Sequence, residues 1–129
     1  MADMSAYLAD KLAEHAVGRT SFTMPATHTV KLHLGAPGSA GTANPALETT
    51  LSADVAFNAV SSGVIANTSA ITWTNVSNAE TYSHISTWDG TTGPGTDNCL
   101  FQGALDAGVL VAVGDDFEIP AGQLTITMA

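Results

Sequence analysis

The sequence predicts a mainly β protein: a single antiparallel β-sandwich or barrel of about eight strands with a short N-terminal helix. Short segments of alternating apolar and polar residues recur from residue 20 onward, and Gly, Pro, Asn and Asp separate them at turn positions. Helical periodicity is confined to the first 18 residues. Strands without intervening helices favour a sandwich or barrel over a parallel sheet.

The helix is expected over residues 1–18. Ser5 is a suitable N-cap, Leu8 and Leu12 lie on one helical face, and Gly18 is placed to end the helix. Because the apolar stripe is narrow, the helix must pack against its own domain or against a neighbouring subunit to be stable. We therefore divide the chain into an N-terminal helix or arm, residues 1–19, and a β-sandwich domain, residues 20–129.

Alternation along the chain also assigns side chains to faces of the expected strands. Lys31 and His33 alternate with apolar residues, which predicts a half-buried strand with these two side chains on its open face. Tyr82 and Ile85 are expected on opposite faces of their strand. The expected strands cover residues 30–34, 48–57, 64–74, 81–88, 100–105, 109–113, 116–119 and 123–128.

The charge distribution excludes several classes of partner. Twelve acidic residues and three basic residues, Lys11, Arg19 and Lys31, give a formal net charge of -9. Three-quarters of the chain therefore has no cation to neutralise phosphates, so neither nucleic acid nor an anionic membrane is an expected partner. A basic or neutral protein surface remains as a partner, and the acidity alternatively serves only solubility.

The sequence shows no signal for secretion or membrane insertion. A single cysteine excludes an intrachain disulfide, and no apolar stretch reaches 18 residues. The N-terminus has neither a positive n-region nor an apolar h-region. We expect a protein that is made in a cytoplasm and stays soluble.

No histidine or cysteine motif predicts a metal site or a nucleophile. The four histidines, His15, His28, His33 and His84, show no ligand spacing, so structural roles are favoured over a metal site. Cys99 follows Asp97, a neighbour that would raise the thiol pKa, and we interpret it as a small buried thiol at the start of a strand.

The densest acidic cluster is Asp115, Asp116 and Glu118. It could bind calcium or supply acid–base catalysis, but its surroundings favour a turn that leads into a strand. The Gly-rich segment 35–41 lacks the Gly-Lys-Ser/Thr ending of a phosphate loop. The sequons at Asn67 and Asn75 do not indicate glycosylation, because the sequence shows no secretory signal.

The aromatic residues have two interpretations. Trp73, Tyr82, Trp88 and Phe101 could form an exposed platform on which a sugar stacks, but alternating aromatic side chains of this kind more often fill a sandwich core. No Gly-x-Ser-x-Gly motif or Ser-His-Asp signature is present. The residues therefore predict no catalytic, cofactor-binding or metal-binding site, and we expect that the protein is not an enzyme.

Three segments resemble a family of short virion proteins of tailed phages. They are His84-Ile85-Ser86-Thr87-Trp88-Asp89, Leu100-Phe101-Gln102-Gly103-Ala104-Leu105, and the C-terminal run from Gly114 to Thr127, which contains Ile119-Pro120-Ala121-Gly122. The resemblance extends over nearly the whole chain and is most specific near the C-terminus. Members are described as tail-fibre or minor tail proteins, or as capsid decoration proteins, and the family brings no catalytic residues.

The resemblance implies a structural protein located in the virion. The first hypothesis is a decoration (cement) protein on the outer surface of the phage head, bound to the major capsid protein and to copies of itself as a trimer. The alternative is a minor tail or tail-fibre component that contacts tail proteins and the host, with Trp88 and the loop 90–98 exposed at its distal face. An enzyme or calcium-dependent module that uses the acidic cluster ranks below both.

Overall fold

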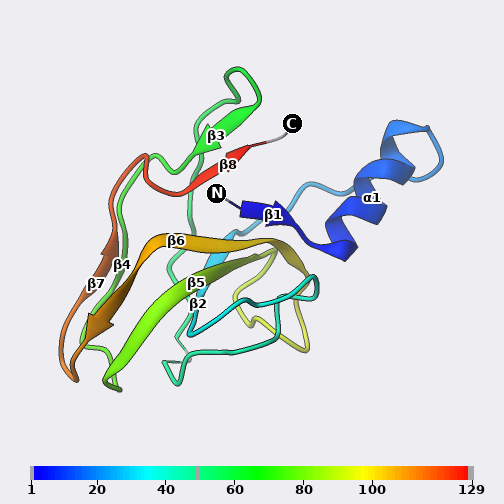
Figure 1. Cartoon of the computed structure of the whole chain (residues 1–129). Coiled ribbons are helices and arrows are strands. Elements are labelled where there is room, and N and C mark those ends of the chain that lie inside the picture. Colours follow the sequence, from blue (N-terminus) through cyan, green and yellow to red (C-terminus); the bar gives the residue numbers. More distant parts are fainter. Residues whose placement is uncertain (1, 49, 128–129) are drawn as a thin grey trace.

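A computed structural model describes residues 2–48 and 50–127 of the chain, and its fold is mainly β (Figure 1). One helix and eight strands are found within these residues, which confirms the predicted fold class. Their bounds are β1 Ala2–Met4, α1 Ala6–Ala16, β2 Thr29–His33, β3 Val64–Ala66, β4 Ile71–Trp73, β5 Glu80–Trp88, β6 Cys99–Val111, β7 Phe117–Ile119 and β8 Thr125–Thr127.

The strands form two sheets. A six-stranded sheet has the order β2-β5-β6-β1-β8-β3, and β4 and β7 form a separate two-stranded sheet. Neighbouring strands are antiparallel, except for a single parallel pairing of Ala2 in β1 with Ile126 in β8. The six-stranded sheet does not close on itself, so the sandwich alternative describes this fold and the barrel does not.

The hydrophobic core lies between the β2-β5-β6 part of the large sheet and the β4-β7 ribbon. The Phe117 ring contacts Trp73, its neighbour in the ribbon, and Tyr82 of β5, with ring centroids 5.6 and 5.2 Å apart, respectively. Burial of these side chains removes a large apolar area from water and is the main stabilising contribution. The other buried core residues are Val30, Leu32, Ala46, Val55, Ile71, Val76, Ile85, Val111, Ile119 and Leu124.

The N-terminal segment begins with a strand rather than with the predicted helix. Residues 2–4 lie between β6 and β8, and the helix starts only at Ala6, because the backbone of Ala2–Met4 pairs with β6. Ser5 is the N-cap as predicted: its Oγ accepts a hydrogen bond from the Leu8 N–H at 3.1 Å. Gly18, at φ +74°, follows the C-cap Val17 and stops the helix as predicted.

The prediction of a half-buried β2 was wrong, since all five residues of this strand are buried. The segment after β2 folds back along its edge, where the Leu34 N–H donates to Asn44 O and the Ala46 N–H donates to Leu32 O. The loops therefore cover the face that was expected to be open. Lys31 and His33 are only 7% and 0% exposed as a result.

No regular strand forms over residues 48–57, where one was predicted, although Thr49 lies outside the described residues. This segment follows the outer edge of β2: the Ser52 N–H donates to Val30 O, and the Val55 N–H donates to His28 O. The Ser52 hydroxyl accepts the Val30 N–H in place of a backbone carbonyl. A side chain thus interrupts the ladder, which period-2 alternation does not reveal.

The predicted strand 64–74 divides into β3 and β4, which belong to different sheets. Asn67, directly after β3, is buried and redirects the chain. Its side-chain NH₂ donates to Ser69 O at 2.8 Å and to Pro120 O at 3.1 Å. A buried amide that bonds local backbone in this way competes with a continuous strand.

The predicted strands 100–105 and 109–113 are one strand, β6, which is interrupted by a wide bulge. Tyr82 pairs with Val109 but His84 pairs with Ala104, so residues 105–108 of β6 lie opposite the single residue Ser83. Tyr82 and Ile85 of β5 belong to the same core cluster, although alternation predicted opposite faces. A bulge changes which face the following side chains occupy.

Candidate functional site: a groove and a projecting arm

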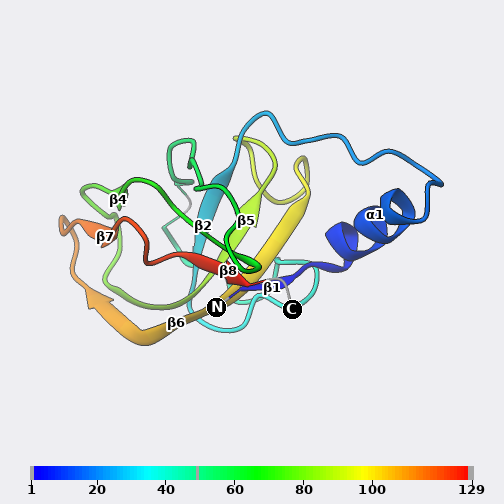
Figure 2. The same ribbon diagram turned by 90° about the horizontal axis from the view of Figure 1, so that it is seen from above.

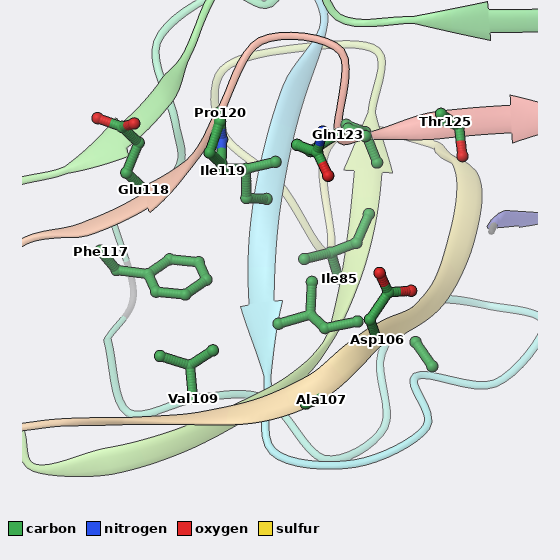
Figure 3. Close-up of a pocket in the computed structure, with 13 residues that line it drawn as sticks. Ile85, Asp106, Ala107, Val109, Phe117, Glu118, Ile119, Pro120, Gln123 and Thr125 are labelled. Atoms are coloured by element: carbon green, nitrogen blue, oxygen red, sulfur yellow. The ribbon is translucent and has the colours of Figure 1, made fainter.

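The β6 bulge forms one wall of a groove with a volume of about 400 Å³. Figure 3 shows Phe117, Val109 and Ile85 around its apolar interior. Asp106 from the bulge and Gln123 from the β7–β8 turn point toward each other from opposite sides. The volume lies within the range of pockets that bind ligands or partner side chains. The remaining lining residues are Ala104, Leu105, Ala107, Glu118, Ile119, Pro120, Leu124 and Thr125.

The opposite wall is the turn between β7 and β8, which hydrogen bonds hold in place. The Leu124 N–H donates to Asn67 Oδ1 at 2.9 Å, and the Gly122 N–H donates to Asn67 O. Gly122 has φ +79°, as the predicted Ala-Gly turn requires. Asn67 is 1% exposed and all its polar groups form hydrogen bonds, so the residue of this glycosylation sequon has a structural role. Because these bonds hold the turn in place, the groove is preformed.

At the other end of the molecule, α1 and the segment that follows it project from the sheets as an arm, residues 6–28 (Figures 1 and 2). Leu8 is the only buried residue of α1 in the described structure. Ser5 fastens the base of the arm: its N–H donates to Leu100 O at 2.8 Å and its hydroxyl donates to Cys99 O. The rest of the helix is left largely uncovered.

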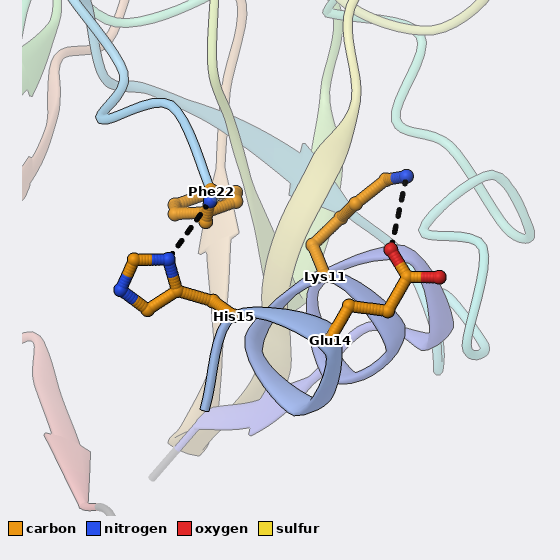
Figure 4. Close-up of polar contacts among 4 residues, drawn as sticks. All are labelled: Lys11, Glu14, His15 and Phe22. Atoms are coloured by element: carbon orange, nitrogen blue, oxygen red, sulfur yellow. Dashed lines mark hydrogen bonds and ion pairs between the residues drawn. The ribbon is translucent and has the colours of Figure 1, made fainter. Parts of the chain in front are cut away.

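The far end of the arm, residues 17–24, is called the arm tip here. The side chains of Val17 and Met24 are 78% and 84% exposed. Figure 4 shows that the Phe22 N–H donates to His15 Nδ1 at 3.0 Å, which folds the tip back on the helix. Lys11 and Glu14 form a solvent-exposed pair at 3.9 Å, of a kind that contributes little to stability. The arm tip thus presents apolar side chains that the other described residues leave exposed.

The two ends differ in charge. Lys11 and Arg19 are both on the arm, and the third base, Lys31, is buried in β2. The acids Asp106 and Glu118 are exposed beside the groove. The accessible positive charge therefore lies on the arm, where Asp10 and Glu14 offset it, and the groove end is negative.

Each histidine makes structural contacts, and His33 and His84 lie opposite each other in the β2–β5 pairing. The His28 ring packs edge-on against Phe57, with centroids 5.1 Å apart, and His84 Nδ1 lies 2.8 Å from Ser83 Oγ. Burial lowers the pKa of His28, although the charges of Asp54 and Asp89 oppose that shift. Among the described residues, no three His, Cys, Asp or Glu side chains are close enough together to hold a metal ion.

His33 belongs to a buried chain of hydrogen bonds. Trp88 Nε1–H donates to Ser86 Oγ at 2.8 Å, Ser86 Oγ lies 2.7 Å from His33 Nε2, and His33 Nδ1 lies 2.9 Å from Ala43 O. The carbonyl only accepts, so Nδ1 carries the proton and Nε2 accepts from Ser86 in the neutral ring. Burial lowers the pKa of His33, which stabilises this neutral form. The arrangement fixes the loop of Ala43 against the sheet.

A buried charged cluster was not anticipated from the sequence. Glu80 accepts hydrogen bonds from the N–H groups of Leu47 and Glu48, at 2.6 and 3.2 Å. Glu48 accepts from the N–H groups of Thr50 and Ser77, both at 3.0 Å. The two carboxylates accept backbone N–H groups of irregular segments, in the place that carbonyl groups of a neighbouring strand would take.

The cluster also changes the pKa of its members. Burial acts to raise the pKa of Glu48, but the hydrogen bonds from Thr50 and Ser77 outweigh it and lower the pKa. Burial lowers the pKa of Lys31, against the opposing charges of Glu48 and Glu80. Burial and the same two carboxylates raise the pKa of Tyr82 to about 12. The Tyr82 hydroxyl is buried and has no hydrogen-bond partner among the described residues.

Cys99 is a buried thiol at the first position of β6, as predicted. Its pKa is raised to about 11, and the cause is burial rather than the proximity of Asp97. Gly41 packs so closely on it that an added Cβ would lie 2.4 Å from the sulfur. A protonated, covered thiol of this kind is a poor nucleophile.

The acidic cluster forms the predicted turn. Asp115 Oδ2 accepts the Ala112 N–H at 2.9 Å, and Asp116 Oδ1 accepts the Asn75 N–H at 2.8 Å. Glu118 lies in β7 and turns outward beside the groove (Figure 3). The three carboxylates therefore do not converge on one point. The Gly-rich segment 35–41 is the loop that was predicted, and it lies against the start of α1 and of β6: the Ala6 N–H donates to Ser39 O, and Gly41 packs on Cys99.

The aromatic residues do not form an exposed platform. Trp73, Tyr82 and Trp88 are buried, and Phe101 is half-buried. The expectation of an exposed Trp88 in a host-contacting face was therefore wrong, because the loops after β2 and β5 cover it. The loop 90–98 is itself held by Asp97, whose carboxylate accepts the N–H groups of Thr92 and Gly93, at 2.7 and 2.6 Å.

Sequence reasoning missed the groove, because a bulge in β6 and a turn after β7 create it jointly. One signal was present: the Asp106-Ala107-Gly108 interruption between two apolar segments, which we interpreted as a break between strands. Interruptions of this kind also mark bulges. The arm tip left a weaker signal in Val17 and Met24, apolar residues outside any periodic pattern.

Comparison with known proteins places this arrangement in a family. A search of curated proteins gave no match. No helix among the described residues is long and apolar enough to cross a membrane. The family model described as "Podophage GP4 fiber I protein gp80" matches residues 3–127, which covers both the arm and the sheets. The chain therefore belongs to this phage fiber protein family and is a structural protein of the phage virion.

Proposed function

We propose that this protein is a fibre component at the tail of the particle, where it works as an assembly subunit without catalysis. The observation that carries the proposal is the two-ended arrangement: an uncovered arm at one end and a preformed apolar groove at the other. Both are surfaces that become buried in an assembly. The family's printed description, a fiber protein, favours the tail over the head.

The partners proposed for this role are other fibre or tail proteins and copies of the chain itself, in a cyclic arrangement such as a trimer. The surface of the sheets is unsuited to nucleic acid, because all the exposed bases lie on the arm. The buried His33, Glu48 and Cys99 have structural partners, which supports the absence of catalysis.

A capsid decoration protein is the second candidate. The arm favours it, because an exposed helix with apolar residues at its tip could clamp the protein onto neighbouring capsid subunits. In that case the partner is the major capsid protein at the outer surface of the head. Decoration would require hundreds of copies in each particle, whereas a fibre position would require few.

Labelling of intact particles tests the two candidates. Antibodies against the purified chain, coupled to gold, should label the tail region in electron micrographs, and quantitative mass spectrometry should give a low copy number relative to the major capsid protein. Labelling spread over the head with a high copy number would replace the fibre proposal with the decoration role. Absence of the chain from purified particles would contradict both.

A further inference from the structure

The arm tip and the groove cannot meet within one molecule. In both Figure 1 and Figure 2, α1 lies at one end of the ribbon, and β4, β7 and the distal part of β6 lie at the other. The base of the arm is fixed to β6 by Ser5, so the arm does not swing freely around the sheets. Any occupant of the groove must come from another molecule.

The chemistry of the arm tip matches that of the groove. Val17 and Met24 are exposed apolar side chains, and Arg19 lies between them in the sequence. Met is flexible enough to fill an irregular apolar cavity. The groove offers an apolar interior and an exposed carboxylate, Asp106, at its edge, with Glu118 nearby. Opposite charges at the edge steer and orient such a contact.

We propose that the arm tip of one copy docks into the groove of a second copy. Met24 or Val17 enters the apolar interior, and Arg19 faces Asp106. The contact is head-to-tail, so it generates a ring if the rotation closes and a filament if it does not. The proposed function includes association between copies of the chain, and this contact names the surfaces that would form it. The inference rests on the proposed function only for that association.

Self-association of the purified full-length chain is the first test, measured by sedimentation velocity over a range of concentrations. Met24→Ser and Asp106→Arg should each weaken the association constant by about tenfold, since each removes a central contact. Val60→Ser is the matched control: Val60 is 66% exposed but lies outside the arm and the groove. It should leave the constant unchanged within about twofold.

A charge exchange tests the pairing itself. Arg19→Asp and Asp106→Arg should each weaken association, and the double variant, in which both charges are exchanged, should recover most of it. Both positions are exposed, so circular dichroism and the unfolding midpoint should match those of the wild type. Arg19→Asp makes the net charge more negative and Asp106→Arg makes it less negative, so weaker association in both single variants separates a direct contact from a general effect of net charge, which would act in opposite directions.

Cross-linking then tests the head-to-tail direction. A chain with Met24→Cys is mixed with a chain with Ala107→Cys, an exposed residue of the groove, and the mixture is oxidised. A disulfide between the two introduced cysteines is expected. The native Cys99 should not compete for it, because this thiol is buried and its pKa is raised to about 11. A mixture of Val60→Cys with Ala107→Cys should give much less of the mixed dimer.

The proposal is overturned if the chain remains monomeric at every concentration reached, or if neither Met24→Ser nor Asp106→Arg changes its association. Association that survives both substitutions would show that copies of the chain associate through another surface. These measurements use the isolated chain, so they stand independently of the labelling experiment. Failure of the fibre position and failure of the arm–groove contact are therefore distinguishable.

Discussion

The sheets and the arm of this protein differ in how far they bury their side chains. In the sheets, even the charged and polar residues Lys31, His33 and Glu80 are buried. The Glu80 carboxylate and both ring nitrogens of His33 form hydrogen bonds. Along α1 only Leu8 is buried, and the arm tip exposes Val17 and Met24. The difference shows that the sheets cover their own side chains, whereas the arm leaves apolar side chains exposed, and we propose that a partner covers them. Substitutions in the two regions should therefore have different consequences.

The largest expected effect is in the sheets. Trp88→Ala removes a 2%-exposed side chain that packs beside Gly41 and donates to Ser86, so it should lower the free energy of unfolding by about 3–5 kcal/mol. Urea denaturation followed by fluorescence of the remaining tryptophan, Trp73, measures the change. Val60→Ala is the control and should stay within about 0.5 kcal/mol of the wild type. A loss below about 1 kcal/mol in Trp88→Ala would contradict this packing.

The next effect is at the joint between the two regions. Ser5→Ala removes the N-cap of α1 and the hydroxyl that donates to Cys99 O, and should lower the free energy of unfolding by about 1–2 kcal/mol. Chemical denaturation and far-UV circular dichroism report the loss. Ser21→Ala, an exposed serine of the arm tip, should leave both unchanged. Equal effects of the two substitutions would mean that Ser5 does not anchor the arm.

A smaller effect is expected from pH. Burial lowers the pKa of His33, so the unfolded chain binds a proton more readily than the folded one. The stability contribution of the neutral ring is complete above the ordinary histidine pKa of about 6.5. It should decline as the pH falls from there toward the lower folded pKa.

The free energy of unfolding should therefore decrease between pH 7.5 and pH 5, and His33→Gln should reduce this decrease. The measurement is a series of urea transitions at several pH values. His28, whose pKa is also lowered by burial, should retain part of the pH dependence in the His33→Gln variant. A pH profile identical to that of the wild type would exclude His33 as a contributor.

The smallest effect on folding is expected at the arm tip. Met24→Ser should change the free energy of unfolding of the monomer by less than about 0.5 kcal/mol, because the side chain is already in water. Thermal denaturation at low protein concentration measures this change. At higher concentration the wild type should gain stability from association that the variant lacks. A concentration-independent midpoint in the wild type would show that association does not stabilise the fold.

The sequence predicted correctly the features that depend on neighbouring residues. Ser5 and Gly18 mark the N-cap and the end of the helix, and Ile119-Pro120-Ala121-Gly122 ends one strand and turns toward the next. Capping and turn formation use hydrogen bonds and backbone angles within a few residues, so the local sequence determines them. The buried Cys99 and the turn role of Asp115 and Asp116 follow in the same way.

Predictions failed where distant segments meet. Alternation assigned Lys31 and His33 to an open face, but the chain from residue 35 to 55 returns along β2 and covers them. It also separated Tyr82 from Ile85, which belong to one core cluster, and it divided β6 into two strands because it cannot reveal a bulge. The groove depends on that same bulge together with a turn that Asn67 holds from β3.

The sequence by itself therefore determined the class of fold, the presence of an N-terminal helix, the acidic character and the family of this virion protein. Periodicity, capping and charge are local or additive properties, and a single chain is sufficient to express them. Only the tertiary structure decided which polar residues are buried, where the groove lies, and that the arm tip stands at the opposite end from it. These features require pairing between residues far apart in sequence, and the register of that pairing is set by bulges and side-chain hydrogen bonds.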